Sequence, residues 1–252
     1  MLLGVDVGGT FTDAALLTGS GELVTAKAPT TPADQSEGAI AAVNAVLESA
    51  GAAAAEVERF VHGMTVGTNA LLEGNVARTA LLATEGFTDL EQLGRQARAE
   101  LYRPCAAQPS PIVPDELRVA VPERMGPEGA LRDLDEEALR ERLAAVRGAR
   151  GDASSSGEGP ESGESRDQPI EAVAVCLLWA FRHPEHERRA EGVVAEALGE
   201  EVHVSTSHAT AGVFREYERC ATTVVDAALS PPTRRYLERL LERARNAGLP
   251  AP

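Results

Sequence analysis

The sequence predicts an α/β fold built on a mixed sheet. Three short apolar runs, at 2–7, 11–17 and 23–27, are separated by glycine-rich turns, which indicates an antiparallel meander of three strands. After residue 30, strand-like apolar runs alternate with segments of helical periodicity, an arrangement typical of α/β proteins. We therefore expect antiparallel strands at the start of the chain and strand–helix alternation further on.

A helix is expected directly after the meander, at 34–49. Asp34 is suited to cap its first turn, Glu37 stands at the capping-box position, and Gly51 ends it. A proline pair at 231–232 is expected to separate the last two helices, because proline removes a backbone donor. The remaining expected elements are strands at 60–63, 79–83, 170–181 and 202–205, and helices from Thr68 or Asn69 to Glu73 and at 135–146, 184–198, 214–229 and 234–247.

The chain is expected to fall into four segments. Residues 1–84 form the N-terminal part, and residues 85–147 form a proline-rich crossing or small subdomain with a following helix. Residues 148–168 contain no large apolar side chain, so burial cannot offset the entropy of ordering them. We expect a disordered acidic loop there, followed by a second α/β part at 169–252.

The charge balance excludes several classes of function. The 252 residues include 24 lysines and arginines against 39 acidic residues, a net charge of −15. Such a chain repels nucleic-acid phosphates and anionic lipid, and it has no apolar stretch long enough to span a membrane. Cys105, Cys176 and Cys220 are too scattered for a disulfide framework or a zinc site. We expect a soluble, cytoplasmic protein with neither a nucleic-acid nor a membrane partner.

The segment DVGGTFTD at 6–13 is the first candidate site. Gly8 and Gly9 follow a strand and let bare backbone N–H groups approach a ligand, while Thr10 and Thr12 add hydroxyl donors. This pattern indicates a phosphate cradle between two strands, unlike the glycine-rich loops that precede a helix. The alternative is an ordinary hairpin turn.

Two carboxylates flank the same turn. Asp6 lies at the end of the first strand and Asp13 lies just beyond the turn. Carboxylates so placed are suited to hold a magnesium ion, directly or through water. Their presence favours the phosphate cradle over the plain hairpin.

A second candidate segment, VHGMTVGTNALLE at 61–73, leads from a strand through a loop into a helix. Its glycines and threonines bring free amides and hydroxyls to the positive end of that helix, where anions are stabilised. His62 is either a general acid or base or a hydrogen-bonded histidine that fixes the loop. Asn69 is either a ligand contact or the helix N-cap.

A third segment, FREYERCATT at 214–223, is expected to be helical. Arg215 and Arg219 would then share one face, and Glu218 and Thr222 another. A salt-bridged, solvated helix face explains this pattern as well as a functional site does.

Four ordered motifs resemble the N-terminal region of the ATP-dependent hydantoinase/5-oxoprolinase family, which also includes the nucleotide-binding subunits of acetone and acetophenone carboxylases. They are DVGGTFTD at 6–13, HGMTVGTNALLE at 62–73, RTALLATEGF at 78–87 and REYERCATT at 215–223. The first motif alone would suit a sugar kinase equally well, but four motifs in order are more specific. Family chains continue through a second lobe, and this chain is expected to end before it.

The resemblance implies an actin/Hsp70/sugar-kinase-like fold in which ribonuclease-H-like lobes close on ATP and Mg²⁺. It implies ATP-driven opening of a cyclic amide such as 5-oxoproline or hydantoin, by phosphorylation of the lactam oxygen. In carboxylase relatives the same step activates a carbonyl or enolate. A second lobe or a partner subunit of hydantoinase B type is also implied.

The resemblance also assigns roles by position. The candidate catalytic residues are Asp6, Asp13 and His62, with Asp6 and Asp13 also managing magnesium; the candidate cofactor-binding residues are Gly8, Gly9, Thr10, Thr12, Thr65, Thr68 and Asn69. Two alternatives stay open: a small-molecule kinase of the same superfamily, and a non-catalytic fragment that binds nucleotide or a partner.

Overall fold

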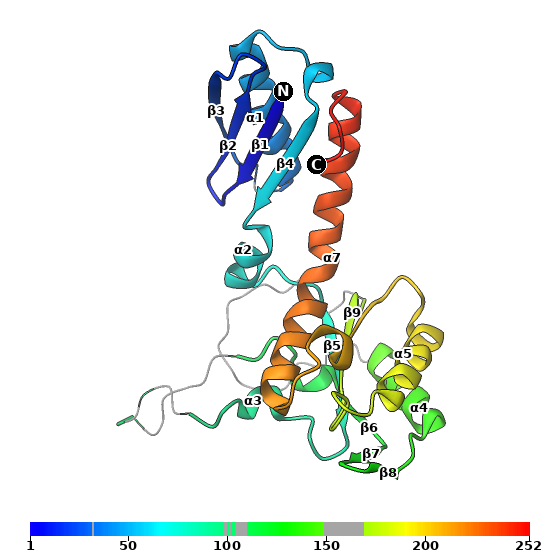
Figure 1. Cartoon of the computed structure of the whole chain (residues 1–252). Helices are drawn as coiled ribbons and strands as arrows, with labels where there is room; N and C mark the ends of the chain where they lie inside the picture. Colours follow the sequence, from blue (N-terminus) through cyan, green and yellow to red (C-terminus); the bar gives the residue numbers. More distant parts are fainter. Residues whose placement is uncertain (32, 98–99, 101, 104–109, 149–168) are drawn as a thin grey trace. The chain divides into compact units, whose positions relative to one another are not determined.

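The computed structural model describes residues 1–31, 33–97, 100, 102–103, 110–148 and 169–252. The chain forms two compact units, each described by itself below (Figure 1). The first unit contains residues 1–76 and 232–252, and the second contains residues 77–231. The strand expected at 79–83 within the N-terminal segment thus belongs to the second unit, and the end of the chain belongs to the first.

The first unit is built on a four-stranded mixed sheet in the order β3-β2-β1-β4. The strands are β1 (Leu2–Val7), β2 (Phe11–Leu17), β3 (Leu23–Pro29) and β4 (Arg59–Met64). The first three pair antiparallel, which confirms the expected meander, and β4 pairs parallel to β1. Parallel pairing needs a crossover, and α1 (Gln35–Ala50) lies in the connection between β3 and β4.

One face of this sheet carries the core of the first unit. Side chains alternate along β1, so that Leu3, Val5 and Val7 are buried against α1. Asp34 caps α1 by accepting the amide of Ser36, as expected, and Gly51 ends it in a left-handed conformation. The carboxylate of Glu37 accepts a hydrogen bond from Arg243 at 2.9 Å, which replaces its expected capping-box role. The unit also contains α2 (Val66–Glu73) and a short 3₁₀ turn, Ala54–Glu56.

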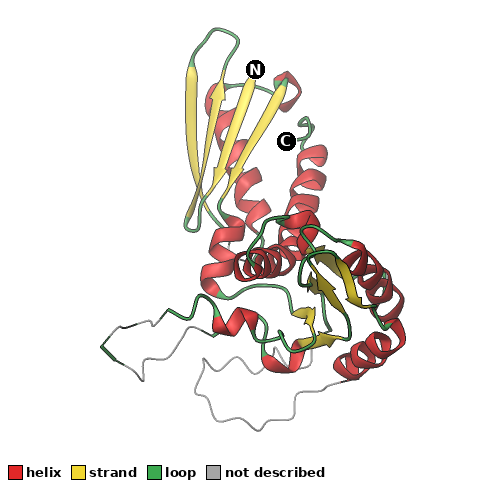
Figure 2. Cartoon of the chain, turned by 60° about the horizontal axis from the view of Figure 1, so that its bottom comes forward, coloured by secondary structure: helices red, strands yellow, loops and turns green. Residues whose placement is uncertain are grey.

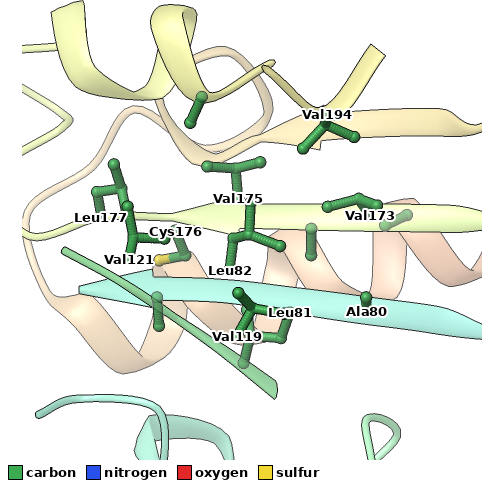
Figure 3. Close-up of a cluster of buried hydrophobic side chains, with 14 of the residues drawn as sticks. Ala80, Leu81, Leu82, Val119, Val121, Val173, Val175, Cys176, Leu177 and Val194 are labelled. Atoms are coloured by element: carbon green, nitrogen blue, oxygen red, sulfur yellow. The ribbon is translucent and has the colours of Figure 1, made fainter. Parts of the chain in front are cut away.

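The second unit is built on a parallel sheet in the order β10-β9-β5-β6. Its strands are β5 (Thr79–Thr84), β6 (Arg118–Val121), β9 (Ala172–Cys176) and β10 (His203–Thr206). Both central strands are buried along their whole length, as parallel strands covered on both faces must be. Figure 3 shows the resulting core, in which Leu82, Val175 and Val194 lie together.

The described part of residues 84–129 contains more regular structure than a coil crossing. This stretch contributes β6 to the sheet edge, and it contains α3 (Leu90–Leu93), a 3₁₀ turn at Asp115–Leu117 and most of a hairpin formed by β7 (Arg124–Gly126) and β8 (Gly129–Arg132). The prolines exclude long helices but leave room for short strands between them. Of the two expected alternatives, the described residues here are too regular for a coil crossing and are compatible with a small subdomain.

The helices of the second unit follow the expected order. The expected ones are α4 (Glu136–Gly148), α5 (Glu185–Leu198) and the start of α7 (Glu216–Asn246), drawn among the helices of Figure 2. The single turn α6 (Ser207–Thr210) was not expected. α4 and α5 pack against each other. The strand expected at 170–181 is shorter, because the chain leaves the sheet after Cys176 and turns from Leu178 onward.

The expected helix break at the proline pair does not occur. α7 runs from Glu216 to Asn246 through both prolines at 231–232. Pro232 has no N–H to donate to the carbonyl of Ala228, four residues earlier. That carbonyl accepts the backbone N–H of Ala77 instead, at 2.9 Å. A donor from outside the helix thus replaces the missing bond.

Two expectations fall outside the described residues: the environment of Cys105 and the disorder of the acidic loop, which lies at 149–168 apart from its first residue. Among the helices in the described part of the chain, none is both long and apolar enough to cross a membrane.

Candidate functional site

The turn between β1 and β2 is held in one narrow geometry. The N–H of Gly8 donates to the carbonyl of Phe11 at 3.1 Å, which leaves Gly9 and Thr10 exposed at the tip. A Cβ at position 8 would lie only 2.9 Å from that carbonyl oxygen, a distance that real Cβ atoms do not tolerate. Neither Gly8 nor Gly9 has a positive φ. Crowding, rather than a left-handed backbone, therefore requires glycine at position 8.

Two threonine hydroxyls support the turn from its buried side. Thr12 is fully buried, and its hydroxyl lies 3.1 Å from that of Thr30. The Thr30 hydroxyl donates to the carbonyl of Gly8 at 2.9 Å, and the backbone N–H of Thr30 donates to the carbonyl of Thr10 at 3.0 Å. Thr12 therefore positions the turn and does not face a ligand outside it, which corrects its expected role. Its alternation with the buried Ala14 predicts this orientation.

The start of α2 lies against the tip of this turn. The N–H and hydroxyl of Thr65 both donate to the carbonyl of Val7 at 3.2 Å, which ties the helix start to the end of β1. The side-chain amide of Asn69 donates to the Thr65 hydroxyl at 3.4 Å. A Cβ on Gly9 would lie 3.1 Å from the same amide nitrogen. The two segments singled out in the sequence thus meet at Gly9 and Asn69.

The helix itself begins earlier than expected. Its first residue is Val66 and its N-cap is Thr65, so Asn69 is not the cap. The backbone N–H groups of the first turn have no acceptors within the helix, since four-residue bonding cannot reach them. Thr68 is exposed within that turn. This end of α2 therefore offers amides, a hydroxyl and the positive pole of the helix dipole.

Asp6 and Asp13 are direct cross-strand partners on the exposed face of the first sheet. Gly63 pairs with Asp6 from the other side, and a Cβ there would lie 3.1 Å from an Asp6 carboxylate oxygen. Glycine at this position thus leaves room for the carboxylate. Asp13 forms an exposed ion pair with Lys27 at 3.2 Å. These four residues line a groove of 730 Å³ on the sheet.

His62 lies on the opposite face of the sheet from the two carboxylates. It alternates with Gly63 along β4, and its Nε2 is 2.7 Å from the hydroxyl of Tyr236. Burial lowers the pKa of His62, although the nearby charge of Asp6 opposes this shift. Burial also raises the pKa of Tyr236, so its phenol keeps the proton beside the imidazole. The geometry favours the fixing role for His62.

The third sequence segment is part of a buried polar network in the second unit. Arg219 is fully buried and donates to the hydroxyl of Ser207 at 3.0 Å and to the carbonyls of Leu177 and Val213. The Ser207 hydroxyl donates to the buried carboxylate of Glu187 at 2.5 Å. The expected shared helix face for Arg215 and Arg219 is wrong, because Arg215 precedes the helix and only Arg219 turns inward.

A second, largely buried network in the same unit joins the start of α5 to the end of β5 and to two loops. His186 lies 2.8 Å from the carboxylate of Glu123 and 3.2 Å from that of Asp133. The other oxygen of Glu123 accepts the hydroxyl of Thr84, which in turn accepts the N–H of Leu178 at 3.1 Å. Sequence reasoning gave no role to Glu123 or Glu187, because no local pattern marks an acid that its partners bury.

Among the described residues, no group of three or more histidine, cysteine, aspartate or glutamate side chains could hold a metal ion. Asp6 and Asp13 form a pair, and further ligands would have to come from water or from a bound molecule. Mg²⁺ is commonly held in this way, by one or two carboxylates together with water and phosphate oxygens.

Known proteins match the chain along most of its length. It is 34% identical over 248 residues to the caprolactamase subunit alpha of Pseudomonas jessenii, covering 94% of this chain and 32% of that one. It is 35% identical over 242 residues to the acetophenone carboxylase gamma subunit of Aromatoleum aromaticum, covering 89% and 30%. The chain therefore spans about a third of the length of these curated relatives.

The fold is matched as well. The crystal structure of the ATP-dependent caprolactamase from Pseudomonas jessenii superimposes with a TM-score of 0.82 at 31% identity, over 100% of this chain and 35% of that one. Residues 2–155 match the family described as the hydantoinase/oxoprolinase N-terminal region. The chain belongs to the hydantoinase/oxoprolinase family, of which it represents the N-terminal region.

Proposed function

We propose that this chain supplies the phosphate- and magnesium-binding part of an ATP-dependent enzyme that opens a cyclic amide. The observation that carries the proposal is the meeting of the β1–β2 tip with the start of α2, where Gly9 lies against Asn69. Exposed backbone at the tip and first-turn amides of α2 provide donors for phosphate oxygens. Gly8, Thr10, Thr65 and Thr68 complete the cradle, while Thr12 holds it in shape.

Magnesium fits the pair of carboxylates beside this cradle. Asp6 and Asp13 offer hard oxygen ligands on neighbouring strands, and Gly63 keeps the space next to Asp6 open. Lys27 neutralises part of the charge on Asp13 and would hold its carboxylate in place. A bound magnesium ion would neutralise phosphate charge, which is the main requirement of phosphoryl transfer.

The proposed fold of the first unit is a ribonuclease-H-like lobe of the actin/Hsp70/sugar-kinase type. The sheet order β3-β2-β1-β4, with an antiparallel meander followed by a parallel strand, supports this assignment. A lobe of this kind needs a second one to enclose ATP. The longer chains of the relatives leave room for such a lobe, and their names as subunits support a partner chain, for which we propose the hydantoinase B type.

The proposed reaction follows from the relatives' chemistry. ATP bound at the cradle would supply a phosphoryl group to the amide oxygen, which makes the carbonyl carbon more electrophilic. Water would then add to that carbon, the C–N bond would break with the ring nitrogen taking a proton, and hydrolysis of the resulting acyl phosphate would release inorganic phosphate and leave a carboxylate. In this reaction the residues of this chain would hold and orient the phosphate groups, keep the β1–β2 turn in one conformation and provide the charges that surround the phosphates. ATP supply and the free thiols of Cys176 and Cys220 suit a cytoplasmic location.

Magnesium-dependent binding of ATP to the 252-residue chain tests this proposal. In titration calorimetry, Asp6→Asn is expected to weaken ATP binding at least tenfold with magnesium present and to change it less than twofold without magnesium. Glu22→Gln, an exposed acid in the turn between β2 and β3, is the matched control and should bind as the native chain does. Equal loss in both variants, or no effect of Asp6→Asn, would overturn the site.

A carboxylase-type reaction is the second candidate, because the acetophenone carboxylase subunit is as similar as the caprolactamase subunit. The complete protein with its partner separates the two. Phosphate release from ATP stimulated by ε-caprolactam, 5-oxoproline or hydantoin supports ring opening, while stimulation by a ketone together with bicarbonate supports carboxylation. Formation of a sugar phosphate would instead identify a small-molecule kinase.

A further inference from the structure

The exposed face of the first sheet arranges its outward side chains in rows that cross the strands. In the register of β3, β2, β1 and β4, one row contains Lys27, Asp13, Asp6 and Gly63. Successive members of this row are direct cross-strand neighbours, which lie close enough to interact. The row therefore places one cation beside two carboxylates, with a position that has no side chain at its far end.

The cation of this row is unusual in its residue type. Lys27 is the only lysine of the chain, whereas the other 23 basic residues are arginines. Among the described residues that line the groove over the row, it is also the only basic one. Arginine presents a rigid, planar fork that holds a carboxylate by two hydrogen bonds, whereas lysine carries a compact charge on a flexible chain. A lysine is therefore suited to a position where the cation changes its partner.

The ammonium of Lys27 lies close to two neighbours at once. Its Nζ is 3.2 Å from a carboxylate oxygen of Asp13 and 5.2 Å from the centre of the Phe11 ring, whose face attracts a cation. Phe11 directly follows Thr10 at the tip of the β1–β2 turn, and its carbonyl closes the turn by accepting the N–H of Gly8. The ammonium therefore lies beside both the carboxylate row and the turn at which phosphate is proposed to bind.

The ion pair between Lys27 and Asp13 is easily exchanged. The two side chains are 56% and 57% exposed, and water screens an ion pair with this exposure so well that it stabilises the fold only weakly. A divalent cation at Asp6 and Asp13 would carry twice the charge of the ammonium and would compete with it for the same carboxylate. A phosphate oxygen at the turn would offer the displaced ammonium a new anionic partner.

We propose that Lys27 determines the specificity of this site for a divalent cation together with phosphate. Lys27 holds Asp13 before the cation binds and passes to a phosphate oxygen when the cation takes Asp13. The cation alone binds weakly, because it displaces the ammonium without giving it another partner. Phosphate alone meets two carboxylates and an ammonium that is already paired. The inference rests on the proposed function for the location of phosphate, and it adds the residue that couples phosphate to the metal.

Two binding measurements on the 252-residue chain test this coupling, with Mn²⁺ as the probe for the metal because carboxylates bind it as they bind Mg²⁺. Electron paramagnetic resonance quantifies free Mn²⁺ without nucleotide, and titration calorimetry measures ATP binding with magnesium. Lys27→Met is expected to bind Mn²⁺ alone about tenfold more tightly and ATP about tenfold more weakly. Lys27→Arg keeps a cation at Asp13, so it should gain no Mn²⁺ affinity and should bind ATP more tightly than Lys27→Met.

Arg59→Met is the matched control, because it removes one positive charge from the same exposed face of the sheet. Arg59 lies on β4 four residues before Gly63. That separation is about 13 Å along the strand, beyond the Debye length of about 8 Å at physiological ionic strength. We expect this variant to bind Mn²⁺ and ATP within about twofold of the native chain. Changes of opposite sign that occur only in Lys27→Met distinguish the coupling from a general loss of charge or of folded structure.

A third measurement follows Lys27 directly in the native chain. Reductive methylation with ¹³C-formaldehyde labels amines and keeps their charge, and the chain has two amines, those of Lys27 and Met1. In NMR spectra, the Lys27 methyl signal is expected to shift more with magnesium and ATP together than with either alone. The Met1 amine is paired with Glu58 at 2.9 Å, so its signal should not move and serves as the reference.

Unchanged or lower Mn²⁺ affinity in Lys27→Met would overturn the inference, as would ATP binding by Lys27→Met equal to that of the native chain. Equal changes in Arg59→Met, or a Lys27 signal that does not move with magnesium and ATP, would overturn it as well. In each of these cases, magnesium-dependent ATP binding by the native chain would leave the proposed function standing. If the native chain binds no ATP, the proposed function fails and this inference fails with it.

Discussion

The two units place the polar residues of their sequence motifs in opposite environments. In the first unit, Asp6, Gly9 and Thr10 are exposed at a sheet face and a turn tip, where few protein groups compete for them. In the second unit, Arg219 and Glu187 are fully buried and linked through Ser207. A motif of charged and hydroxyl residues therefore does not by itself indicate a ligand site.

The sheets explain this difference. The mixed sheet of the first unit has one face in the core and leaves the other face, with Asp6 and Asp13, open. The parallel sheet of the second unit is buried along β5 and β9, so polar groups at the ends of these strands lie in a desolvated region. Such groups must find protein partners, because an unpaired buried polar group is costly.

The largest expected effect is in the buried network. Arg219→Met removes the donors to Ser207, Leu177 and Val213 and leaves Glu187 without its linked cation. We expect the free energy of unfolding of the second unit to fall by about 3–5 kcal/mol, as for other buried charges that lose their partner. Hydrogen exchange of the β9 amides in urea measures this change.

Arg95→Met is the control for that experiment, since it removes an exposed arginine from an ion pair. We expect this variant to lower the free energy of unfolding by less than about 1 kcal/mol. Equal losses of unfolding free energy in the two variants would contradict the contrast between buried and solvent-exposed polar groups.

The turn of the first unit should respond next. Gly8→Ala would place a Cβ 2.9 Å from the carbonyl oxygen of Phe11, a backbone atom that cannot move without opening the turn. We expect the free energy of unfolding to fall by about 1–3 kcal/mol, the range for overpacked sites, and ATP to bind more weakly. Gly19→Ala, where a Cβ meets nothing within 4 Å, should leave both thermal stability and ATP binding unchanged.

A smaller effect is expected from Thr30→Val. This change deprives the buried hydroxyl of Thr12 and the carbonyl of Gly8 of a partner. We expect a cost of about 1 kcal/mol in chemical denaturation, with ATP affinity reduced because the cradle loosens. Thr25→Val, on the exposed face of β3, serves as the control for stability, and a similar loss of unfolding free energy there would argue against a supporting role for the Thr12–Thr30 pair.

The smallest effect concerns the pH dependence of the first unit. Because burial lowers the pKa of His62, the unfolded chain binds a proton there at a higher pH than the folded chain. The stability from a neutral His62 is complete above the unfolded pKa of about 6.5 and is lost as pH falls below it toward the folded pKa. We expect the melting temperature to fall between pH 7 and 5, and less steeply in His62→Gln. Identical slopes would contradict this.

Local patterns predicted much of the first unit. Period-two alternation and glycine turns identified the meander, and Asp34 and Gly51 marked the ends of α1. Local patterns failed where a distant partner decides the outcome. The helix passes the proline pair because Ala77 supplies a donor, and β6 forms because β5 offers it a parallel edge.

The sequence predicted only part of the candidate site, because local patterns do not reveal partners that lie far away in the chain. Asp6, Asp13, Gly8 and Gly9 were found because the turn chemistry is contained within eight residues. The partner of His62 could not be found, because Tyr236 lies 174 residues away. The same holds for Arg219, whose acceptors come from three separate segments.

The sequence by itself determined the meander, the glycine turn with its flanking acids and the family, because these depend on neighbours in the chain and on ordered motifs. Only the tertiary structure decided which polar residues are available to a ligand. It turned Thr12, His62 and Arg219 inward and left Asp6 and Asp13 at the surface. The solvent exposure of a side chain depends on which helices and strands cover its face of the sheet or helix. Packing between segments that are distant in the sequence decides which elements do so.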